Sequence, residues 1–539
     1  MRGADLVVEE LREAGVEKIF TLSGNQIMPL FDACIDSGIE LVHVRHEAAA
    51  VYMADAWSQL TGKVGVALVT AAPGFVNCLT ALYGTSGTES AVVLLSGDSP
   101  VSQDGRGAFQ ELHQTGVSEG IVKHAHRCVD PDKLDYDIAR AIRVATDGRP
   151  GPVHLALPFD VLNAGISEPH MREPNPFSNP PLEPDDGEVQ QTISLLCAAA
   201  KPLILTGPAL NPTRAPGAVL SLADKFDVPV VTVESPRGLR GPELGDLRNV
   251  LPQADLVLLL GKRADFTIAF GQPPAFDSGC RFIAADAESD AIELAERNLG
   301  ARLVQSVHAD PAAMAGAMDA LEIQPGTPRA EWRDTVADSI ASRFIDTGKV
   351  MSDDGRILPA QLCRSVQRLL DAADDPILLA DGGEFGQWAQ ACVTAPTRLI
   401  NGTAGAIGGV LCYALAAGLC RPGATVVAMM GDGTAGFHLS EFDTAVRYGI
   451  RFLAVIGNDA RWNAEYQIQK RDYGGDRLIG CELLPTRYDL AVAGLGGHGE
   501  YVTKPEELDD ALDRAASSGL PACINVRIEG VAAPAGAGH

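Results

Sequence analysis

The sequence ATVVAMMGDGTAGFHLSEFDTAVRYGIRFLAVIGND, residues 424–459, contains two apolar runs that each end in glycine and polar residues. The first run, residues 424–430, is followed by GDG, and the second, residues 452–456, by GND. An amphipathic, helix-like segment separates them. This pattern predicts a strand–helix–strand unit whose polar ends lie at one edge of a parallel sheet. Because ligands bind at the carboxyl ends of such strands, we expect a binding site there.

The GDGTAG turn at residues 431–436 has two interpretations. It matches the G-x-G-x-x-G pattern of a dinucleotide site, but the carboxylate of Asp432 would then repel a pyrophosphate. A divalent metal between them removes the repulsion, and Asp459 supplies a second carboxylate at the neighbouring strand end. Mg²⁺ is commonly held by one or two carboxylates plus phosphate oxygens. Gly431 and Gly433 let backbone N–H groups approach the phosphates. We therefore favour the metal–diphosphate interpretation.

The GDG turn, the spacer and the second polar tip resemble the cofactor signature of thiamine diphosphate (ThDP) enzymes of the acetolactate synthase-like family. That group includes acetolactate synthases, 2-hydroxyacyl-CoA lyases and oxalyl-CoA decarboxylases. The resemblance implies ThDP and Mg²⁺ as cofactors, with Asp432, Asp459 and the backbone carbonyl of Arg461 as metal ligands. The family usually has Asn where Asp459 stands; a carboxylate there still binds Mg²⁺ but adds negative charge. The cofactor contacts implied for this turn are Gly431, Asp432, Gly433, Thr434, Ala435 and Asp459.

The segment RHEAAAVYMADAWSQLTGKVGVALVTAAPGFVN, residues 45–77, resembles the first-domain signature of the same family. Taken alone, Glu47 would be an acid at a helix N-terminus, favoured by the helix dipole. The resemblance instead implies that Glu47 hydrogen-bonds the pyrimidine N1′ of ThDP, so that the 4′-imino form removes the C2 proton. Asn77 matches the family's Asn in that loop, and Gln110, in Phe109-Gln110-Glu111, would line the active site. Nearby polar residues expected at the surface or in support are His113, Gln114, Lys123 and His124.

Two further loops resemble family elements. The resemblance places the loop DGGEF, residues 381–385, against the diphosphate and the active-site mouth, which makes Gly383, Glu384 and Phe385 cofactor contacts. NGTAGAIG, residues 401–408, resembles the glycine-rich turn under the thiazolium, where the bulky Ile407 would wedge between the two rings and bend the cofactor. Taken alone, Ile407 would be a core residue. Candidate substrate contacts are Gln110, Glu384, Gln387 and Asn463, and Trp462, Tyr466 and Tyr473 are expected to cap the site.

Composition narrows the class of protein. The chain has 539 residues, of which 46% are hydrophobic, so it can form about three domains. The net charge of −27 argues against nucleic acid as a partner. The 11 cysteines contain no C-x-x-C pair, which argues against a zinc site or a disulfide scaffold and indicates a reducing cytoplasm. Residues 1–15 lack the apolar core of a signal peptide, and no apolar run is long enough to cross a membrane.

Apolar runs alternate with helical segments along the chain, which predicts an α/β protein of three doubly wound parallel-sheet domains. The expected limits are 1–163 for the pyrimidine-binding domain, 164–187 for a linker, 188–325 for a central domain, 326–355 for a second linker, 356–530 for the diphosphate-binding domain and 531–539 for a disordered tail. Strands are expected at residues 18–22, 41–44, 64–70, 91–96, 153–156, 202–205, 229–232, 256–260, 281–284, 377–380, 424–430, 452–456 and 522–528.

The resemblance implies decarboxylation of a pyruvate-like 2-keto acid and ligation of the product to a second carbonyl, in a homodimer or homotetramer. Alternatives are 2-hydroxyacyl-CoA cleavage, oxalyl-CoA-type decarboxylation, a ThDP-binding paralogue without turnover, and an NAD-dependent oxidoreductase that uses the GDGTAG turn. The central domain lacks the longer stretch expected with FAD, which argues against that cofactor. A role in binding CoA or an adenine nucleotide stays open for Arg237, Lys262 and Arg263.

Overall fold

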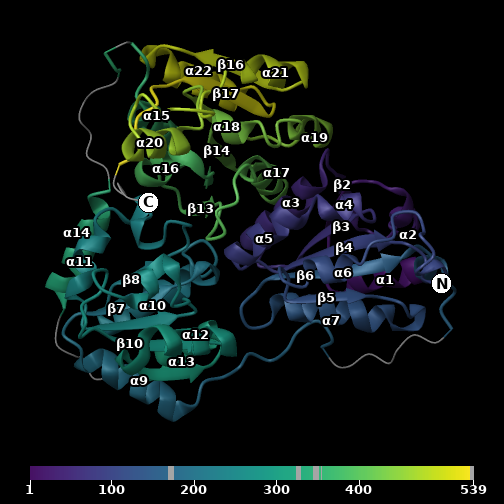
Figure 1. The fold of residues 1–539 in the computed structure, drawn as a ribbon, viewed down its shortest axis with the longest axis horizontal. Coiled ribbons are helices and arrows are strands. Elements are labelled where there is room, and N and C mark those ends of the chain that lie inside the picture. The colour runs from purple at the N-terminus through teal and green to yellow at the C-terminus, as the bar shows by residue number, and fades with distance from the viewer. Residues whose placement is uncertain (168–174, 323–328, 344–350, 354, 535–539) are drawn as a thin grey trace. The chain divides into compact units, whose positions relative to one another are not determined.

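The computed structural model describes residues 1–167, 175–322, 329–343, 351–353 and 355–534, with the side chains of 218–220 left aside. It contains three sheets in which all paired strands are parallel (Figure 1). This confirms the predicted α/β class with parallel sheets. No helix in the described part of the chain combines the length and the apolar character that a membrane crossing needs.

The first sheet has the strand order β2-β1-β3-β4-β6-β5. Its central strands are continuously buried, as expected for parallel strands covered on both faces. Helices α1 and α7 pack into one core cluster, whereas α3 and α5 pack against each other and α3 against β3. The bounds are α1 Gly3–Glu13, β1 Lys18–Thr21, β2 Glu40–His43, α3 Glu47–Thr61, β3 Gly65–Val69, α5 Leu79–Thr88, β4 Val92–Asp98, β5 His124–Arg127, α7 Leu134–Thr146 and β6 Pro152–Pro158.

The second sheet has the order β11-β10-β9-β7-β8 and two separate hydrophobic cores. One core contains residues of α11, α12 and α14, and the other contains residues of α9, α10 and α13. The bounds are α9 Asp186–Ala198, β7 Pro202–Thr206, α10 Pro216–Phe226, β8 Val230–Thr232, α11 Leu247–Val250, β9 Leu256–Leu260, β10 Arg281–Asp286, α12 Ser289–Leu299, β11 Leu303–His308, α13 Pro311–Ala320 and α14 Ala330–Ala341. Helix α14 lies inside the predicted linker 326–355, and its Trp332 and Val336 are buried in the first of these cores.

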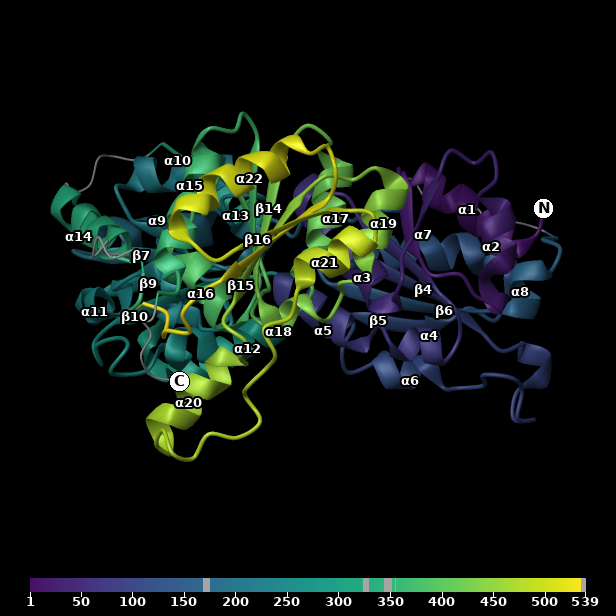
Figure 2. The same cartoon turned by 90° about the horizontal axis from the view of Figure 1, so that it is seen from above.

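The third sheet has the order β13-β12-β14-β15-β17-β16 and contains the strand–helix–strand unit that the sequence predicts. Strands β14 and β15 are neighbours, with Gly431 in register with Gly457. The bounds are α15 Pro359–Asp371, β12 Pro376–Ala380, α16 Gly383–Cys392, β13 Thr397–Ile400, α17 Val410–Cys420, β14 Thr425–Gly431, α18 Asp432–Ala435, α19 Glu441–Tyr448, β15 Leu453–Asn458, α20 Asn463–Asp472, α21 Tyr488–Gly494, β16 His498–Val502, α22 Leu508–Ser517 and β17 Ala522–Arg527. Figure 2 shows α20 and the loop after it extending away from this sheet.

The predicted strands are all present, with ends that shift by two residues or fewer. Four strands that the sequence does not predict are β5, β11, β13 and β16. Each of them is an edge strand of its sheet.

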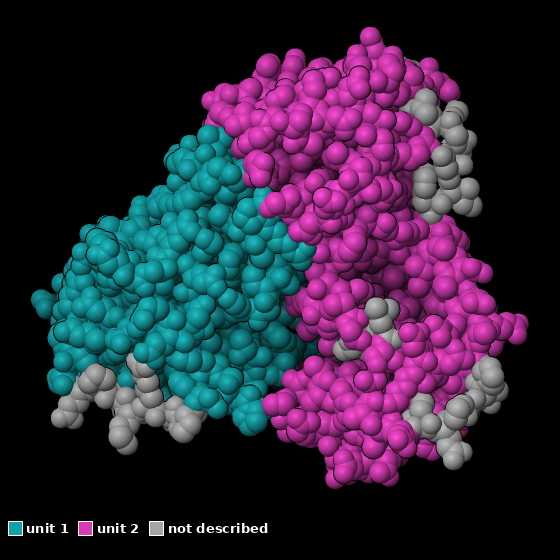
Figure 3. Space-filling model, turned by 180° about the vertical axis from the view of Figure 1, so that it is seen from behind, with its two compact units in different colours: residues 1–180, 411–422, 438–450 teal, residues 181–410, 423–437, 451–539 magenta. Residues whose placement is uncertain are grey.

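The described residues form two compact units, coloured separately in Figure 3. Unit 1 comprises residues 1–180, 411–422 and 438–450, and unit 2 comprises the remainder. Most of α17 and all of α19 thus belong to the same compact unit as the first sheet, although they flank β14 in the sequence. Residues 168–174 of the first predicted linker and 535–539 of the predicted tail lie outside the described residues, whereas 531–534 are described.

Candidate active site

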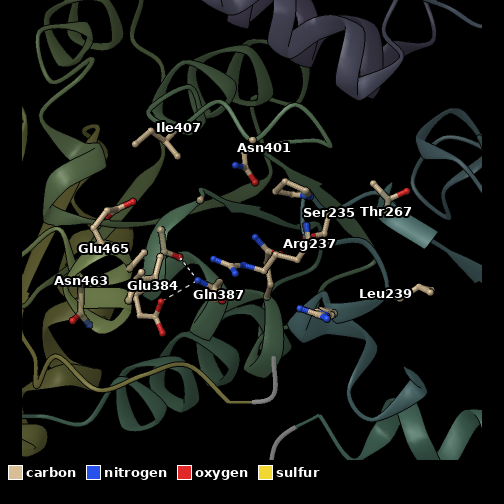
Figure 4. Close-up of a pocket in the computed structure, with 18 of the residues that line it drawn as sticks. Ser235, Arg237, Leu239, Thr267, Glu384, Gln387, Asn401, Ile407, Asn463 and Glu465 are labelled. Atoms are coloured by element: carbon tan, nitrogen blue, oxygen red, sulfur yellow. Dashed lines mark hydrogen bonds between the residues drawn. The ribbon is translucent and has the colours of Figure 1, made fainter. Parts of the chain in front are cut away.

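A cavity of about 1230 Å³ lies in unit 2, at the carboxyl ends of strands β12, β14 and β15. One part of its wall is formed by the segments that follow these strands and β13, and the other part is formed by residues between 235 and 275, around the second sheet. Figure 4 shows side chains from both parts pointing toward the cavity. The position agrees with the prediction that ligands bind where the strands of a parallel sheet end.

Asp432 and Asp459 form a buried acidic pair in the cavity wall, with exposures of 1% and 6%. Burial raises the pKa of both carboxyl groups, and the charge of Asp432 raises that of Asp459 further. Hydrogen bonds from the backbone of Asp459 and Arg461 counter part of the rise at Asp432. The three predicted metal ligands are therefore together. Oδ2 of Asp432 is buried and has no hydrogen-bond partner among the described residues.

The turn after β14 leaves room beside this pair because two of its residues are glycines. A Cβ on Gly433 would lie 2.6 Å from the ring of Trp462. Gly431 caps the short helix α18, where Thr434 donates a hydrogen bond to the carbonyl of Gly431 at 3.0 Å and Ala435 is buried. Gly431, Gly433 and Thr434 line the cavity. The backbone of this turn is therefore exposed to a ligand, as the diphosphate interpretation requires.

Ile407 also lines the cavity, where it packs tightly against the turn after β12. A Cβ on Gly382 would lie 2.7 Å from Cγ2 of Ile407. Asp381, which the sequence does not single out, holds both segments: its carboxylate accepts from the N–H of Gly382 at 2.7 Å and from that of Gly408 at 3.1 Å. Burial raises the pKa of Asp381 to about 6. Ile407 is thus fixed in position from both sides.

Glu384 and Gln387 lie on α16 at the wall of the cavity (Figure 4). Glu384 accepts hydrogen bonds from Nε2 of Gln387 at 3.1 Å and from the N–H of Ala533 at 2.6 Å. Burial raises the pKa of Glu384. The opposite charge of Arg237, also in the wall, counters this rise. The described part of the predicted tail therefore contacts the site through Ala533.

Glu47, in unit 1, is the first residue of α3 and is half-buried. Nδ2 of Asn77 donates to its carboxylate at 2.9 Å, so the structure brings these two predicted residues together. A Cβ on Gly74 would lie 3.5 Å from Oε1 of Glu47 and 2.8 Å from a methyl carbon of Thr70. Thr70 begins a hydrogen-bond chain that passes through Gln26 to Gln110, with each distance 2.7 Å. Gln26 and Thr70 are additional polar residues of this loop cluster.

Glu441 holds the loop that presents Glu47. It lies at the start of α19, is fully buried, and accepts from the backbone N–H groups of Arg45 and His46 at 2.9 and 3.1 Å. Its other oxygen accepts from Thr444 at 2.6 Å. Glu441 follows Arg45 by 396 residues, so no local pattern in the sequence signals this contact.

Comparison with known proteins identifies two parts of the chain. Residues 1–117 match the family described as thiamine pyrophosphate enzyme, N-terminal TPP binding domain, and residues 381–526 match its C-terminal TPP binding domain. The chain is 31% identical to "Acetolactate synthase large subunit IlvG" of Mycobacterium tuberculosis over 538 residues, which covers 98% of this chain and 95% of the relative. The chain belongs to the thiamine diphosphate enzyme family.

Two other relatives are named for a different activity. The chain is 31% identical over 591 residues to human "2-hydroxyacyl-CoA lyase 2", with 98% of this chain and 90% of the relative covered. It is 27% identical over 563 residues to "2-hydroxyacyl-CoA lyase" of Arabidopsis thaliana, with 98% and 95% covered. The family is thus established, whereas the relatives divide between a synthase and lyases.

The geometry fits the cofactors of this family of ThDP enzymes. Two buried carboxyl groups side by side are unfavourable unless a proton or a cation compensates their charge. The unpartnered oxygen of Asp432 is of the type that Mg²⁺ prefers, and exposed backbone at Gly431 and Gly433 suits phosphate oxygens. Asn401 Oδ1, on the loop that carries Ile407, is also buried and has no hydrogen-bond partner in the described part of the chain.

The remaining predicted residues of this ThDP enzyme have varied surroundings. Phe385 lines the cavity but packs on the backbone of β15, where a Cβ on Gly457 would meet its ring at 2.5 Å. Asn463 and Trp462 line the cavity, and the Arg461 guanidinium stacks 4.4 Å from the ring of Tyr466. Other predicted residues lie away from it: Tyr473 is 65% exposed, Lys262 is close to Asp265, and Arg263 pairs with Asp290.

The polar residues near Gln110 in sequence are supporting or surface groups, as expected. Gln114 is buried, accepts from the N–H of Ala72 at 3.0 Å and donates to the carbonyl of Gly97 at 2.9 Å. It thereby fixes the loop that leads to Asn77. The others are half-buried or exposed: His113, Lys123 and His124.

Proposed function

We propose that this protein uses ThDP and Mg²⁺ to decarboxylate a pyruvate-like 2-keto acid and to join the remaining acyl unit to a second carbonyl compound. The observation that carries the proposal is the buried pair Asp432 and Asp459, with its unpartnered oxygen, in a cavity that also contains Ile407. Full-length similarity to an acetolactate synthase large subunit supports this reaction type.

Each proposed ligand has a defined role. Asp432, Asp459 and the carbonyl of Arg461 would hold Mg²⁺, and the backbone of Gly431 and Gly433 would receive the diphosphate. Bound ThDP supplies the carbanion and the electron sink that decarboxylation needs. Ile407, fixed through Gly382 and Asp381, would keep that cofactor bent.

Glu47 would hold a proton at its carboxylate for the pyrimidine ring of the cofactor. Asn77 donates to one carboxylate oxygen at 2.9 Å, which orients the group and leaves the other oxygen for that proton. Because Asn77 is an uncharged donor, it fixes the geometry of the carboxylate without forming an ion pair with it. Gln110, the last residue of the hydrogen-bond chain that runs from Thr70 through Gln26, would contact the substrate.

The part of the cavity wall that contains Arg237, Glu384 and Gln387 would receive the substrate. Arg237 offers guanidinium donors for a carboxylate, and Gln387, whose Nε2 donates to Glu384, lies in the same wall (Figure 4). Arg237 is more than half buried, and burial lowers its pKa while Glu384 counters that effect. A poorly hydrated guanidinium binds a carboxylate more strongly than an exposed one does. Asn463 would contact the acceptor.

Cleavage of a 2-hydroxyacyl-CoA is the second candidate function. The cavity is larger than a small keto acid needs, and its wall includes Arg240 and Arg248 in addition to Arg237. Such a set of cations suits a substrate with phosphate groups. Similarity to 2-hydroxyacyl-CoA lyases over the whole chain also favours it. In either case we propose a cytoplasmic homodimer or homotetramer.

The test is turnover of apo-protein supplied with ThDP and Mg²⁺. Pyruvate alone, pyruvate with 2-ketobutyrate, and a 2-hydroxyacyl-CoA are offered separately, with and without FAD, while CO₂, acetohydroxy acid and aldehyde are measured. Acetohydroxy acid formed without FAD would support the synthase proposal. Aldehyde and formyl-CoA without CO₂ would replace it with the lyase. Absence of ThDP binding would overturn both.

A further inference from the structure

We propose that His126, Cys128 and Asp137 form a zinc site in unit 1, outside the cofactor cavity. Their ligand atoms, one from each side chain, all lie within 4.8 Å of one another. Nε2 of His126 is 3.5 Å from Oδ2 of Asp137. In tetrahedral zinc coordination, neighbouring nitrogen, oxygen and sulfur ligands lie about 3.3–3.6 Å apart, so only small side-chain movements are needed.

Local structure explains why these residues meet. Strand β5 ends at Arg127, and the N–H of Cys128 continues its pairing with a hydrogen bond to Ala156 at 2.9 Å. His126 and Cys128 are two residues apart on an extended chain, so their side chains point to the same face. Asp137 lies in the first turn of α7, which packs in the same core as Cys128. The site would join an edge strand to the helix that covers it.

Burial of the three residues suits zinc with one open position. Cys128 is fully buried, the Asp137 side chain is 10% exposed, and the His126 side chain is 40% exposed. Solvent can therefore reach the fourth position through the histidine, where a water would complete the tetrahedron. One thiolate, one carboxylate and one imidazole favour Zn²⁺ over Mg²⁺ or Ca²⁺, which take oxygen ligands.

Charge balance gives the site its driving force. Burial raises the pKa of the Cys128 thiol, and the nearby Asp137 carboxylate raises it further. Burial also raises the pKa of Asp137. With Zn²⁺ bound, two negative ligands and a neutral imidazole give a site of zero net charge, which is the form that a buried location favours.

Other charged and aromatic groups surround the site. The charge of Arg140 acts on Asp137 and opposes a cation there, while His124 stacks on His126 with ring centroids 5.9 Å apart. His124 is half-buried, and its stacking limits the rotation of His126. The sequence argument against zinc concerns only paired cysteines, because a ligand from α7 cannot be recognised from the spacing along β5.

The first experiment measures Zn²⁺ bound to the full chain in the presence of ThDP and saturating Mg²⁺. We expect one Zn²⁺ per chain after dialysis, measured by mass spectrometry of the metal. Loss of an outer-sphere partner of a metal typically costs 10–100-fold in affinity, so Cys128→Ser, which removes a direct ligand, should cost at least about 100-fold. Cys34→Ser is the matched control, because Cys34 is a buried thiol of the same core. Equal zinc affinity in wild type and Cys128→Ser would overturn the proposal.

The second experiment replaces zinc by Co²⁺, whose thiolate complexes have a charge-transfer absorption. Wild type and Cys34→Ser should show this band, and Cys128→Ser should lack it. Metal bound by Asp432 and Asp459 has no thiolate and cannot produce the band. If Cys128→Ser does not fold, His126→Gln and Asp137→Asn each provide a substitution at a side chain that is at least partly solvent-exposed. In both variants, titration of the band should give a cobalt affinity at least about 100-fold lower than in wild type. An unchanged affinity in both would overturn the proposed site.

Discussion

Glu47 in unit 1 and Asp432 in unit 2 are both acids next to the end of a parallel strand, but their surroundings differ. Glu47 is half-buried and accepts a hydrogen bond from the side chain of Asn77. Glu441 holds its loop by accepting from the backbone N–H groups just before Glu47. Asp432 is 1% exposed, lies beside a second acid and has one oxygen without a partner. The surroundings of Asp432 therefore support the proposed Mg²⁺ site on structural grounds. The proposed role of Glu47 depends on the family to which the chain belongs.

Replacing Asp432 should have the largest effect on cofactor binding. Asp432→Asn removes the charge that the proposed Mg²⁺ needs, so we expect the Mg²⁺-dependent affinity for ThDP to fall by about 100-fold or more. Turnover at a fixed ThDP concentration should fall with it. Trp462, which lines the cavity, provides a fluorescence signal for the titration.

Asp224→Asn is a suitable control for this experiment, since the Asp224 side chain is 79% exposed. Wild-type ThDP affinity in Asp432→Asn, at limiting Mg²⁺, would show that the acidic pair is not the metal site. The surroundings of Glu47 and Asp432 would then differ only in how tightly the two side chains are packed.

Replacing Glu47 should separate binding from chemistry. Glu47→Gln keeps the shape and the acceptor for Asn77 but cannot exchange a proton, so turnover should fall by about 10²–10⁴-fold while ThDP remains bound. Steady-state rates and cofactor titrations on the same preparation measure both quantities. Exposed Glu119→Gln is the control. Near-full turnover of Glu47→Gln with bound cofactor would remove Glu47 from the mechanism.

The sequence predicts the strands inside the sheets better than the strands at the edges. Eleven of the predicted strands lie inside their sheets, and their continuous apolar runs reveal them, whereas β2 and β8 are predicted although they are edges. The unpredicted strands are edges with sequences such as HAHR in β5 and HGEYV in β16, whose residues are largely half-buried. Polar residues are tolerated on an edge because one side of the strand faces solvent, so the apolar signal is lost.

The candidate site shows the same limit. Residues after apolar strands, such as Asp432 and Asp459, could be predicted because their position follows from the strand pattern. Glu441 and Ala533 could not, because they reach their partners across 396 and 149 residues. The cluster of His126, Cys128 and Asp137 could not be predicted for two reasons. Strand β5 is an edge strand without an apolar run, and Asp137 comes from a separate helix, α7.

Glu441 offers a test of whether the loop of Glu47 must be held in place. Glu441→Ala leaves the N–H groups of Arg45 and His46 without their acceptor, which should cost about 1–3 kcal/mol in the free energy of unfolding. Misplacement of Glu47 should lower turnover by about tenfold or more. Glu441→Gln keeps an acceptor oxygen and should restore most of both, as measured by urea unfolding and steady-state rates.

The control for Glu441 is Thr444→Val, which removes the hydrogen bond from Thr444 to the other oxygen, and with it the one that Arg447 donates to Thr444 at 3.1 Å. It should leave turnover close to that of wild type. If Glu441→Ala turns over like wild type, the loop of Glu47 is rigid without this support.

Glu243 should have the smallest effect on turnover, and it tests whether an unpartnered buried oxygen is enough to mark a site. Both oxygens of Glu243 are buried without a hydrogen-bond partner among the described residues, as is Oδ2 of Asp432, yet Glu243 does not line the cavity. Burial raises the pKa of Glu243 from 4.5 to about 7, although the charge of Arg398 opposes the rise.

This shift predicts how Glu243 affects stability at different pH values. Because the raised pKa means that the folded protein binds the proton more tightly than the unfolded chain, wild type should lose stability as pH rises from about 4.5 through 7. Glu243→Gln cannot ionise, so it should be more stable than wild type by about 3 kcal/mol at pH 8 and nearly equal to it at pH 4. Urea unfolding at the two pH values measures the difference, and turnover should be unchanged. A gain of the same size at both pH values would mean that Glu243 is not neutralised by folding, and an effect on turnover would extend the functional cavity to Glu243.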